Sequence, residues 1–182
     1  MLLFVNACVR DDSRTRKLAE GLLDKLNEEY VELKLEDCDF PLTNEEFLKK
    51  RDALIAETKW DDPMFALARQ FAEADRIVVA APYWDLSFPA ALKQYFEQIN
   101  VLGITFEYSP EGFPIPKCKA DKLYYVTTAG GAFVPEEYGF GYVKALSQSF
   151  YGIGEVELIK AVGLDIYGAD VDAIIKEAVE SI

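Results

Sequence analysis

Five short apolar runs, separated by segments with helical spacing, constrain the fold of this chain more than any other feature. The runs lie at residues 2–5, 31–35, 77–81, 123–127 and 156–161. Apolar runs of four to eight residues, several of them rich in β-branched side chains, are typical of strands in parallel sheets. Strands that alternate with helices predict a doubly wound sheet with helices on both faces. We therefore expect an α/β fold of three layers, built as one domain over residues 1–182.

Composition excludes several functional classes. The formal net charge of −13 makes nucleic acid an unfavourable partner, because phosphate neutralisation needs a basic surface. The chain has no histidine, which removes Ser-His-Asp and Cys-His catalysis and the usual zinc and iron sites. A cofactor that brings its own reactivity fits a chain that lacks a side-chain proton shuttle near neutral pH.

The cysteines and the hydropathy of the chain indicate the cellular compartment of the protein. The three cysteines (Cys8, Cys38 and Cys118) form no Cys-x-x-Cys pair, which favours reduced thiols in a cytoplasmic protein and argues against zinc or a disulfide framework. No apolar run reaches the roughly 20 residues that a bilayer span needs. Residues 1–5 lack a basic region and a cleavage site, so we expect a first strand there and no signal peptide or membrane partner.

Capping signals predict where several helices begin. Ser13 precedes a helix, Thr43 with Glu46 has the spacing of a capping box, and Ser87 precedes Pro89 at the start of a helix that extends to residue 99. Other helices are expected over 63–74 and 142–151 and from Val171 to the end. Residues 104–114 predict an extended arm with a turn, whereas the acidic stretch 36–62 allows a lid or an excursion from the domain.

The loop after the first strand is basic, in contrast to the acidic chain as a whole. It combines three arginines with two hydroxyl side chains at a helix N-terminus: Arg10, Ser13, Arg14, Thr15 and Arg16. Free N–H groups, the positive end of the helix dipole and guanidinium donors together favour a phosphate group. The alternative is that Ser13 only caps the helix and that the basic side chains face water.

The same loop allows a second interpretation. Cys8 and Arg14 have the Cys-x5-Arg spacing found in the nucleophile loop of small tyrosine phosphatases, and Asp62-Pro63 is similar to their acid loop. Asp11 and Asp12 inside the loop would repel both a thiolate and a phosphate ester. The loop also lacks the glycine that a tight ring of inward N–H groups favours. We therefore keep a Cys-dependent phosphatase as the less favoured hypothesis.

Two further loops follow the third and fourth strands. Tyr83 and Trp84 are large aromatics in a short loop after residue 81, and Gly130 and Gly131 follow Thr128. Aromatics at such a place form either a ligand-binding lip or ordinary core and interface contacts, and paired glycines permit close backbone approach or a plain turn. In a sheet of order 2-1-3-4-5, the loops after strands 1, 3 and 4 lie side by side at the edge where ligands bind.

The chain resembles the flavodoxin-like NAD(P)H:quinone oxidoreductase and FMN-dependent azoreductase family. The most specific segments are 81–96 and 103–106, whose family counterpart reads like APMYNFSIPSQLKNYF…GVTFRY. The resemblance covers nearly the whole chain except 36–62. Asp85 stands where the family usually has Asn, and Ala129 where the azoreductases have Arg. The implied fold is a flavodoxin-like, doubly wound parallel sheet of five strands in the order 2-1-3-4-5.

The resemblance also implies a cofactor, an activity and an assembly. Ser13 and Thr15 match hydroxyls on the FMN phosphate, residues 83–86 match the flavin loop, and 128–131 match a loop near the pyrimidine end of the ring. Arg10 and Arg14 of the basic loop are added to the residues that the resemblance implies. The cofactor-binding residues expected are then Arg10, Ser13, Arg14, Thr15, Pro82, Tyr83, Trp84, Asp85, Leu86, Thr128, Ala129, Gly130 and Gly131. No side chain is expected to be catalytic, because the flavin carries the chemistry.

The implied reaction is ping-pong hydride transfer from NADH or NADPH, through FMN, to a small-molecule acceptor such as a quinone, an azo compound or a nitroaromatic. The family's sites are completed at a homodimer interface, for which 106–113 and 133–142 are candidate segments. The alternative from a different class is an FMN-binding electron carrier without nicotinamide turnover, which the strong acidity would suit.

Overall fold

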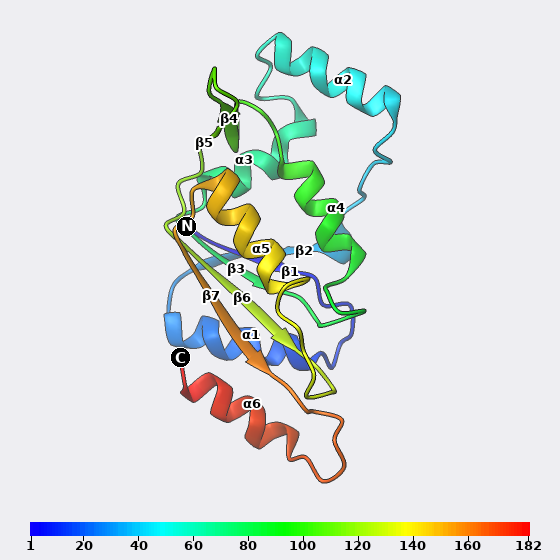
Figure 1. The fold of residues 1–182 in the computed structure, drawn as a ribbon, viewed down its shortest axis with the longest axis vertical. Coiled ribbons are helices and arrows are strands. Elements are labelled where there is room, and N and C mark those ends of the chain that lie inside the picture. The colour runs from blue at the N-terminus through cyan, green and yellow to red at the C-terminus, as the bar shows by residue number, and fades with distance from the viewer.

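A five-stranded parallel sheet forms the centre of the computed structural model, which describes residues 1–182 (Figure 1). Its strand order, β2-β1-β3-β6-β7, is the predicted order 2-1-3-4-5, since β4 and β5 form a separate hairpin. The strands across the sheet are β2 (Tyr30–Lys34), β1 (Leu2–Asn6), β3 (Arg76–Ala80), β6 (Lys122–Thr128) and β7 (Glu155–Ala161). The predicted strands are thus confirmed to within a residue or two at each end.

The strand register brings three loops to one place. Asn6 of β1 pairs with Ala80 of β3, and Ala80 pairs with Val126 of β6, so these strands end at nearly the same level. All of β1 is buried, as expected for a central strand covered on both faces. The edge strand β2 is exposed or half-buried along its length, which agrees with the alternation of apolar and charged residues over 31–35.

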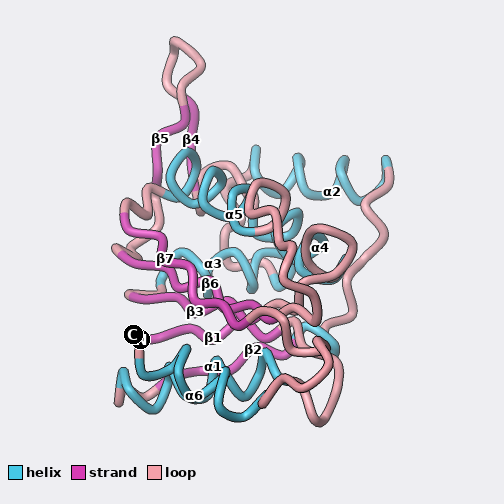
Figure 2. Tube along the Cα trace, turned by 60° about the horizontal axis from the view of Figure 1, so that its bottom comes forward, coloured by secondary structure: helices cyan, strands magenta, loops and turns pink.

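Helices cover both faces of the sheet and complete the three predicted layers (Figure 2). One face is covered by α1 (Arg14–Leu26) and α6 (Val171–Glu180). The other is covered by α3 (Ala66–Glu73), α4 (Ala90–Ile99) and α5 (Phe140–Leu146). Each face has its own core, centred on leucines of α1 on one side and on the buried aromatics Phe71, Tyr95 and Tyr151 on the other.

Two of the three predicted caps are wrong. Ser13 does cap α1, where its Oγ accepts a hydrogen bond from Arg16 N at 3.2 Å. The helix α2 (Glu45–Ala56) is capped by Asn44 and not by Thr43. Asn44 directly precedes the first residue of the helix, and its Oδ1 accepts a hydrogen bond from Phe47 N at 2.9 Å. Pro89 itself occupies the N-cap of α4, and Ser87 donates instead to the carbonyl of Tyr138 at 2.7 Å.

Two segments project from this three-layered body. Helix α2 has no buried residue and lies at the periphery, apart from the sheet (Figure 1). The predicted arm forms a hairpin of β4 (Phe106–Tyr108) and β5 (Pro114–Pro116) that extends away from the body (Figure 2). Shorter elements are 3₁₀ turns at Leu35–Asp37 and Pro63–Phe65 and a π-helical turn at Ser147–Tyr151, which continues α5. None of the helices combines the length and the apolar character needed to cross a membrane.

Candidate functional site

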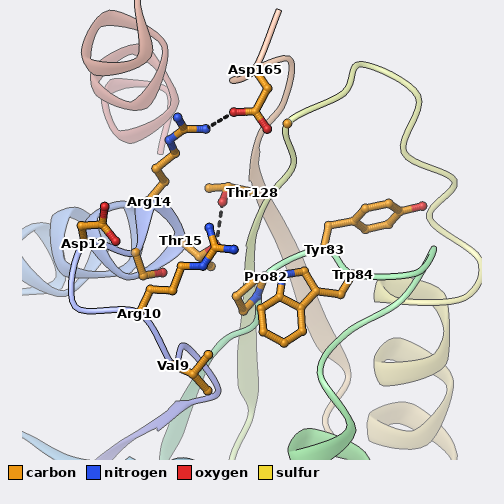
Figure 3. A pocket seen from close by; sticks show the side chains of 12 residues that line it. Val9, Arg10, Asp12, Arg14, Thr15, Pro82, Tyr83, Trp84, Thr128 and Asp165 are labelled. Carbon is orange, nitrogen blue, oxygen red and sulfur yellow. Dashed lines mark hydrogen bonds and ion pairs between the residues drawn. The ribbon is translucent and has the colours of Figure 1, made fainter.

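A cavity of about 340 Å³ lies at the carboxyl edge of the sheet, between the loops after β1, β3 and β6 (Figure 3). Open parallel sheets bind ligands at this edge, where the strand order reverses. Nine of the predicted cofactor-binding residues line it: Arg10, Ser13, Arg14, Thr15, Pro82, Tyr83, Trp84, Thr128 and Gly130. The other four, Asp85, Leu86, Ala129 and Gly131, lie on the same loops but outside the cavity lining.

Hydrogen bonds to Thr128 join all three loops. Its Oγ1 lies 2.6 Å from Oγ1 of Thr15 in α1, and its carbonyl accepts from Tyr83 N at 3.1 Å. Both threonine side chains are buried. One hydroxyl donates to the other, so only one of the two O–H groups is left to donate to a ligand. The sequence predicted both residues at the site but not their contact.

The N-terminus of α1 presents unpaired amides to the cavity. Ser13 Oγ accepts from Arg16 N, and no acceptor is recorded for the backbone N–H groups of Arg14 and Thr15. These groups lie at the positive end of a 13-residue helix. Such an end binds anions, phosphate above all, because free donors and the helix dipole act together.

The arginines of the first loop divide between two environments. Arg10 and Arg14 line the cavity together with Thr15 and Thr128 (Figure 3). Arg16, which we expected to add phosphate affinity, lies outside the cavity, where its Nε donates to Glu20 at 2.9 Å and its Nη2 lies 3.9 Å from Glu32. That expectation is wrong, because the first pair has the i,i+4 spacing that favours a contact along the helix surface.

The second loop turns sharply beside the cavity. Trp84 and Ser87 exchange two backbone hydrogen bonds, and the residues between them, Asp85 and Leu86, both have positive φ, of 51° and 67°. This combination is characteristic of a type I′ turn, and for leucine it costs on the order of 1 kcal/mol. The N–H groups of Asp85 and Leu86 find no acceptor within the chain. Backbone strain of this kind is found where a binding site fixes the loop.

The two aromatics of this loop point in different directions. The Trp84 ring lies beside Pro82 at the cavity and is 40% exposed (Figure 3). The ring of Tyr83 points away from Arg10, and its hydroxyl donates to the carbonyl of Pro135 at 3.4 Å. Tyr83 therefore fixes the 131–139 loop, whereas Trp84 offers an aromatic surface to a ligand.

The loop after β6 is held to the sheet at its first residue and has unpaired amides at the two residues that follow. Ala129 N donates to Ala161 of β7, which holds the first residue against the sheet and leaves Ala129 buried. No acceptor is recorded for the amides of Gly130 and Gly131. Gly130 lines the cavity, so its unpaired N–H group is suited to an acceptor atom of a ligand, whereas Gly131 lies outside the lining.

The structure does not support the phosphatase hypothesis. Cys8 is buried, lies outside the cavity lining, and directs its Sγ at the carbonyl of Ala80, 3.9 Å away. Burial raises the pKa of the Cys8 thiol to about 11, whereas a nucleophilic cysteine needs a lowered pKa. Asp62 caps the turn that precedes α3 and also lies outside this cavity.

Three lining residues were not predicted: Val9, Asp12 and Asp165. Val9 and Asp12 belong to the first loop, whose other residues Arg10 and Ser13 were predicted at the site. Asp165 follows β7, and its Oδ1 accepts from Arg14 Nη1 at 2.6 Å (Figure 3). The only sequence signal for Asp165 is its position just after the fifth strand, at the same edge of the sheet.

The comparisons with known proteins agree with this architecture. A family model described as the flavodoxin-like fold matches residues 1–182. The FMN-dependent NADH:quinone oxidoreductase of Lachnoclostridium phytofermentans is 35% identical over 98% of this chain and 94% of its own length. The FMN-dependent NADH:quinone oxidoreductase 2 of Clostridium acetobutylicum has the same identity and the same coverage.

Solved structures show the same likeness. The crystal structure of an azoreductase from Bacillus anthracis superposes with a TM-score of 0.82 at 26% identity, and the match covers 99% of this chain and 95% of that one. The chain therefore belongs to the flavodoxin-like family that these FMN-dependent oxidoreductases share. The resemblance predicted from residues 81–96 and 103–106 is confirmed.

The environment of Cys8 generates a test. A pKa near 11 leaves roughly one thiol in 10,000 ionised at pH 7, against a few per cent for a free cysteine. We expect iodoacetamide to modify Cys8 in the folded protein at least about 100-fold more slowly than in the protein unfolded in guanidinium, as followed by mass spectrometry. Equal rates in the two states would contradict this account of the thiol.

Proposed function

We propose that this chain is an FMN-dependent NADH:quinone oxidoreductase whose cofactor binds in the cavity at the carboxyl edge of the sheet. The observation that carries the proposal is the convergence of free backbone donors, two arginines and an exposed tryptophan from three loops of a family member. Relatives 35% identical over nearly the whole chain carry this activity in their names. Residues 1–182 act as one FMN-binding domain in this proposal.

The donors of the first loop fit the phosphate of FMN. The amides of Arg14 and Thr15 have no internal acceptor, and the Arg10 guanidinium lies in the cavity without an ion-pair partner. The side chain of Ser13 lines the same cavity. A phosphate has enough acceptor oxygens to satisfy several such donors at once, and charge-assisted bonds of this kind are the strong ones.

The remaining donors fit the ring system and its ribityl chain. Trp84 would provide an aromatic surface to the ring, and the amide of Gly130 would provide a donor for the negative charge that a flavin ring gathers on reduction. The Thr15–Thr128 hydroxyl pair leaves one O–H group that is not used between the two residues, and we assign it to the phosphate through Thr15. The free amides of Asp85 and Leu86 do not depend on the Asp85 side chain, so the replacement of the family's Asn leaves these backbone donors in place.

Bound FMN would supply the redox chemistry that carries reducing equivalents from NADH to a quinone. The protein then has to hold the ring, leave one face open to both substrates, and place fixed donors around it. No side chain has to carry a proton near neutral pH, which agrees with the absence of histidine. Three unpaired cysteines are consistent with a cytoplasmic location, which is part of the proposal.

The activity is tested by the visible spectrum of the purified protein. We expect bound flavin to bleach when NADH is added without oxygen, and its colour to return when a quinone is added. A protein that binds no FMN would contradict the proposal. Flavin that binds but does not react with NADH would favour the electron-carrier alternative instead.

The phosphate donors give a sharper prediction. Replacing Ser13 and Thr15 together by alanine should weaken FMN binding about tenfold or more, because hydrogen bonds to a charged group are worth roughly 1.5–3 kcal/mol each. The measurement is titration of the apoprotein with FMN, followed by flavin fluorescence. Ser181→Ala, which removes a hydroxyl at the far end of α6, is the control and should leave the affinity unchanged. Equal affinities for the double variant and the control would overturn the assignment.

We also propose that the protein is a homodimer. Large apolar side chains are exposed on the β4–β5 hairpin, where Phe113 is 71% exposed, and on the 131–139 loop beside the site, where Phe133 is 81% exposed. The hairpin also exposes Tyr108 and Ile115, and apolar side chains that gather on one exposed segment mark interaction surfaces.

Sedimentation velocity tests the assembly. We expect the protein at micromolar concentration to sediment at twice its chain mass, and Phe113→Ser to shift it toward the monomer. Leu42→Ser, also at a highly exposed position but outside the hairpin and the loop, is the matched control and should sediment like the wild type. A monomeric wild-type protein would contradict the proposal.

A further inference from the structure

The cavity contains a carboxylate that is already paired with one of its two arginines. Asp165 Oδ1 accepts from Arg14 Nη1 at 2.6 Å, and the same nitrogen lies 3.5 Å from the carbonyl of Leu164 (Figure 3). Both side chains line the cavity. The two residues are 151 positions apart in the chain, so the contact is made only when β7 takes its place in the sheet.

Backbone contacts, and not the ion pair alone, fix where Asp165 lies. Asp165 N donates to Gly130 O at 2.9 Å, and Leu164 N and Gly163 N donate to Ala129 O and Gly131 O. The loop after β7 is thus joined to the loop after β6. A Cβ on Gly130 would lie 2.0 Å from Asp165 Oδ2, so the carboxylate covers the glycine at close range.

The charges that line the cavity sum to zero. Arg10 and Arg14 are balanced by Asp12 and Asp165, and the other lining residues are uncharged. A flavin phosphate brings up to two negative charges to this place. Arg10 has no ion-pair partner and is available to that phosphate, whereas Arg14 is available only when its contact with Asp165 opens.

Opening the pair requires little free energy. The side chains of Arg14 and Asp165 are 41% and 70% exposed, and ion pairs with such exposure contribute little net stability. A phosphate dianion carries more charge and more acceptor oxygens than a carboxylate, so it attracts a guanidinium more strongly. The same dianion is repelled by a carboxylate held nearby.

From these contacts we propose that Asp165 is a specificity-determining residue of the flavin site. Its carboxylate competes with the flavin phosphate for Arg14, and it thereby reduces the preference of the site for FMN over riboflavin. The inference rests on the proposed function and adds a residue that limits cofactor affinity. Asp165 lines the cavity itself, so its charge acts on any phosphate that binds there.

The test is Asp165→Asn, which keeps the shape of the side chain and removes its charge. We expect the apoprotein of this variant to bind FMN about three- to tenfold more tightly than wild type, since one repelling charge a few ångströms away has roughly that effect in a solvated site. Riboflavin, which lacks the phosphate, should bind both proteins within about twofold. Asp61→Asn, an exposed change of the same charge outside the cavity, should alter neither affinity.

A double variant separates competition for Arg14 from a general effect of charge. Arg14→Gln should weaken FMN binding and leave riboflavin binding unchanged. In the Arg14→Gln background, Asp165→Asn should gain less FMN affinity than it does in the wild type, because the contested guanidinium is gone. An equal gain in both backgrounds would overturn competition through Arg14. Weaker FMN binding by Asp165→Asn, or equal changes for both flavins, would overturn the proposal as a whole.

Inorganic phosphate distinguishes this proposal from the proposed function. We expect phosphate to raise the melting temperature of the Asp165→Asn apoprotein more than that of the wild type, because ligands stabilise the state that binds them. Failure of wild type to bind any flavin would contradict the proposed function, and the phosphate experiment would still decide the role of Asp165. Equal melting shifts for the two proteins would contradict that role.

Discussion

The hydrogen bonds of Thr128 are the interaction on which the rest of the site depends. Its hydroxyl contacts Thr15 at 2.6 Å and its carbonyl accepts from Tyr83 N, so one residue at the end of β6 fixes α1 and the loop after β3 together. The parallel register makes this possible, because β1, β3 and β6 end at nearly the same level. Loops that are positioned by a rigid sheet can then present backbone donors without internal partners.

The local chemistry of the cavity differs from that of the chain as a whole. The protein carries a formal charge of −13, yet two of its arginines converge at this edge and only one of them is paired there. Cysteine is excluded as a nucleophile here, since burial raises the pKa of Cys8 to about 11. The chain thus contributes positions, donors and an aromatic surface to the reaction. In the proposed function, the balance of charges at Arg14 and Asp165 limits how tightly a phosphate is held.

The sheet could be predicted from sequence because its signals are local. Apolar runs such as 77–81 and the helical spacing between them specify strand, helix and order, and they do not depend on distant contacts. The Ser13 cap was predicted correctly for the same reason. The site loops followed once the strands were placed, and nine of the thirteen expected residues line one cavity.

Two of the errors arose where a residue had two possible partners, and one site residue was missed because its contact is not local. Ser87 could cap α4, but the turn at Trp84 directs its hydroxyl to Tyr138 instead. Arg16 could face the phosphate, but Glu20 one helical turn away holds it outside. Asp165 reaches Arg14 only through the docking of the loop after β7 onto Gly130, a contact that depends on the assembled sheet. No local pattern around residue 165 encodes that contact.

Titration of the ¹⁵N-labelled apoprotein with FMN, followed by amide NMR, tests the central claim most directly. The account predicts saturable shifts that are largest at the unpaired amides of Arg14, Thr15 and Gly130 and at the indole N–H of Trp84, which line the cavity from three separate loops. Small shifts at these four N–H groups, with the largest changes elsewhere, for example along α2, would place the flavin outside the carboxyl-edge cavity and contradict the account.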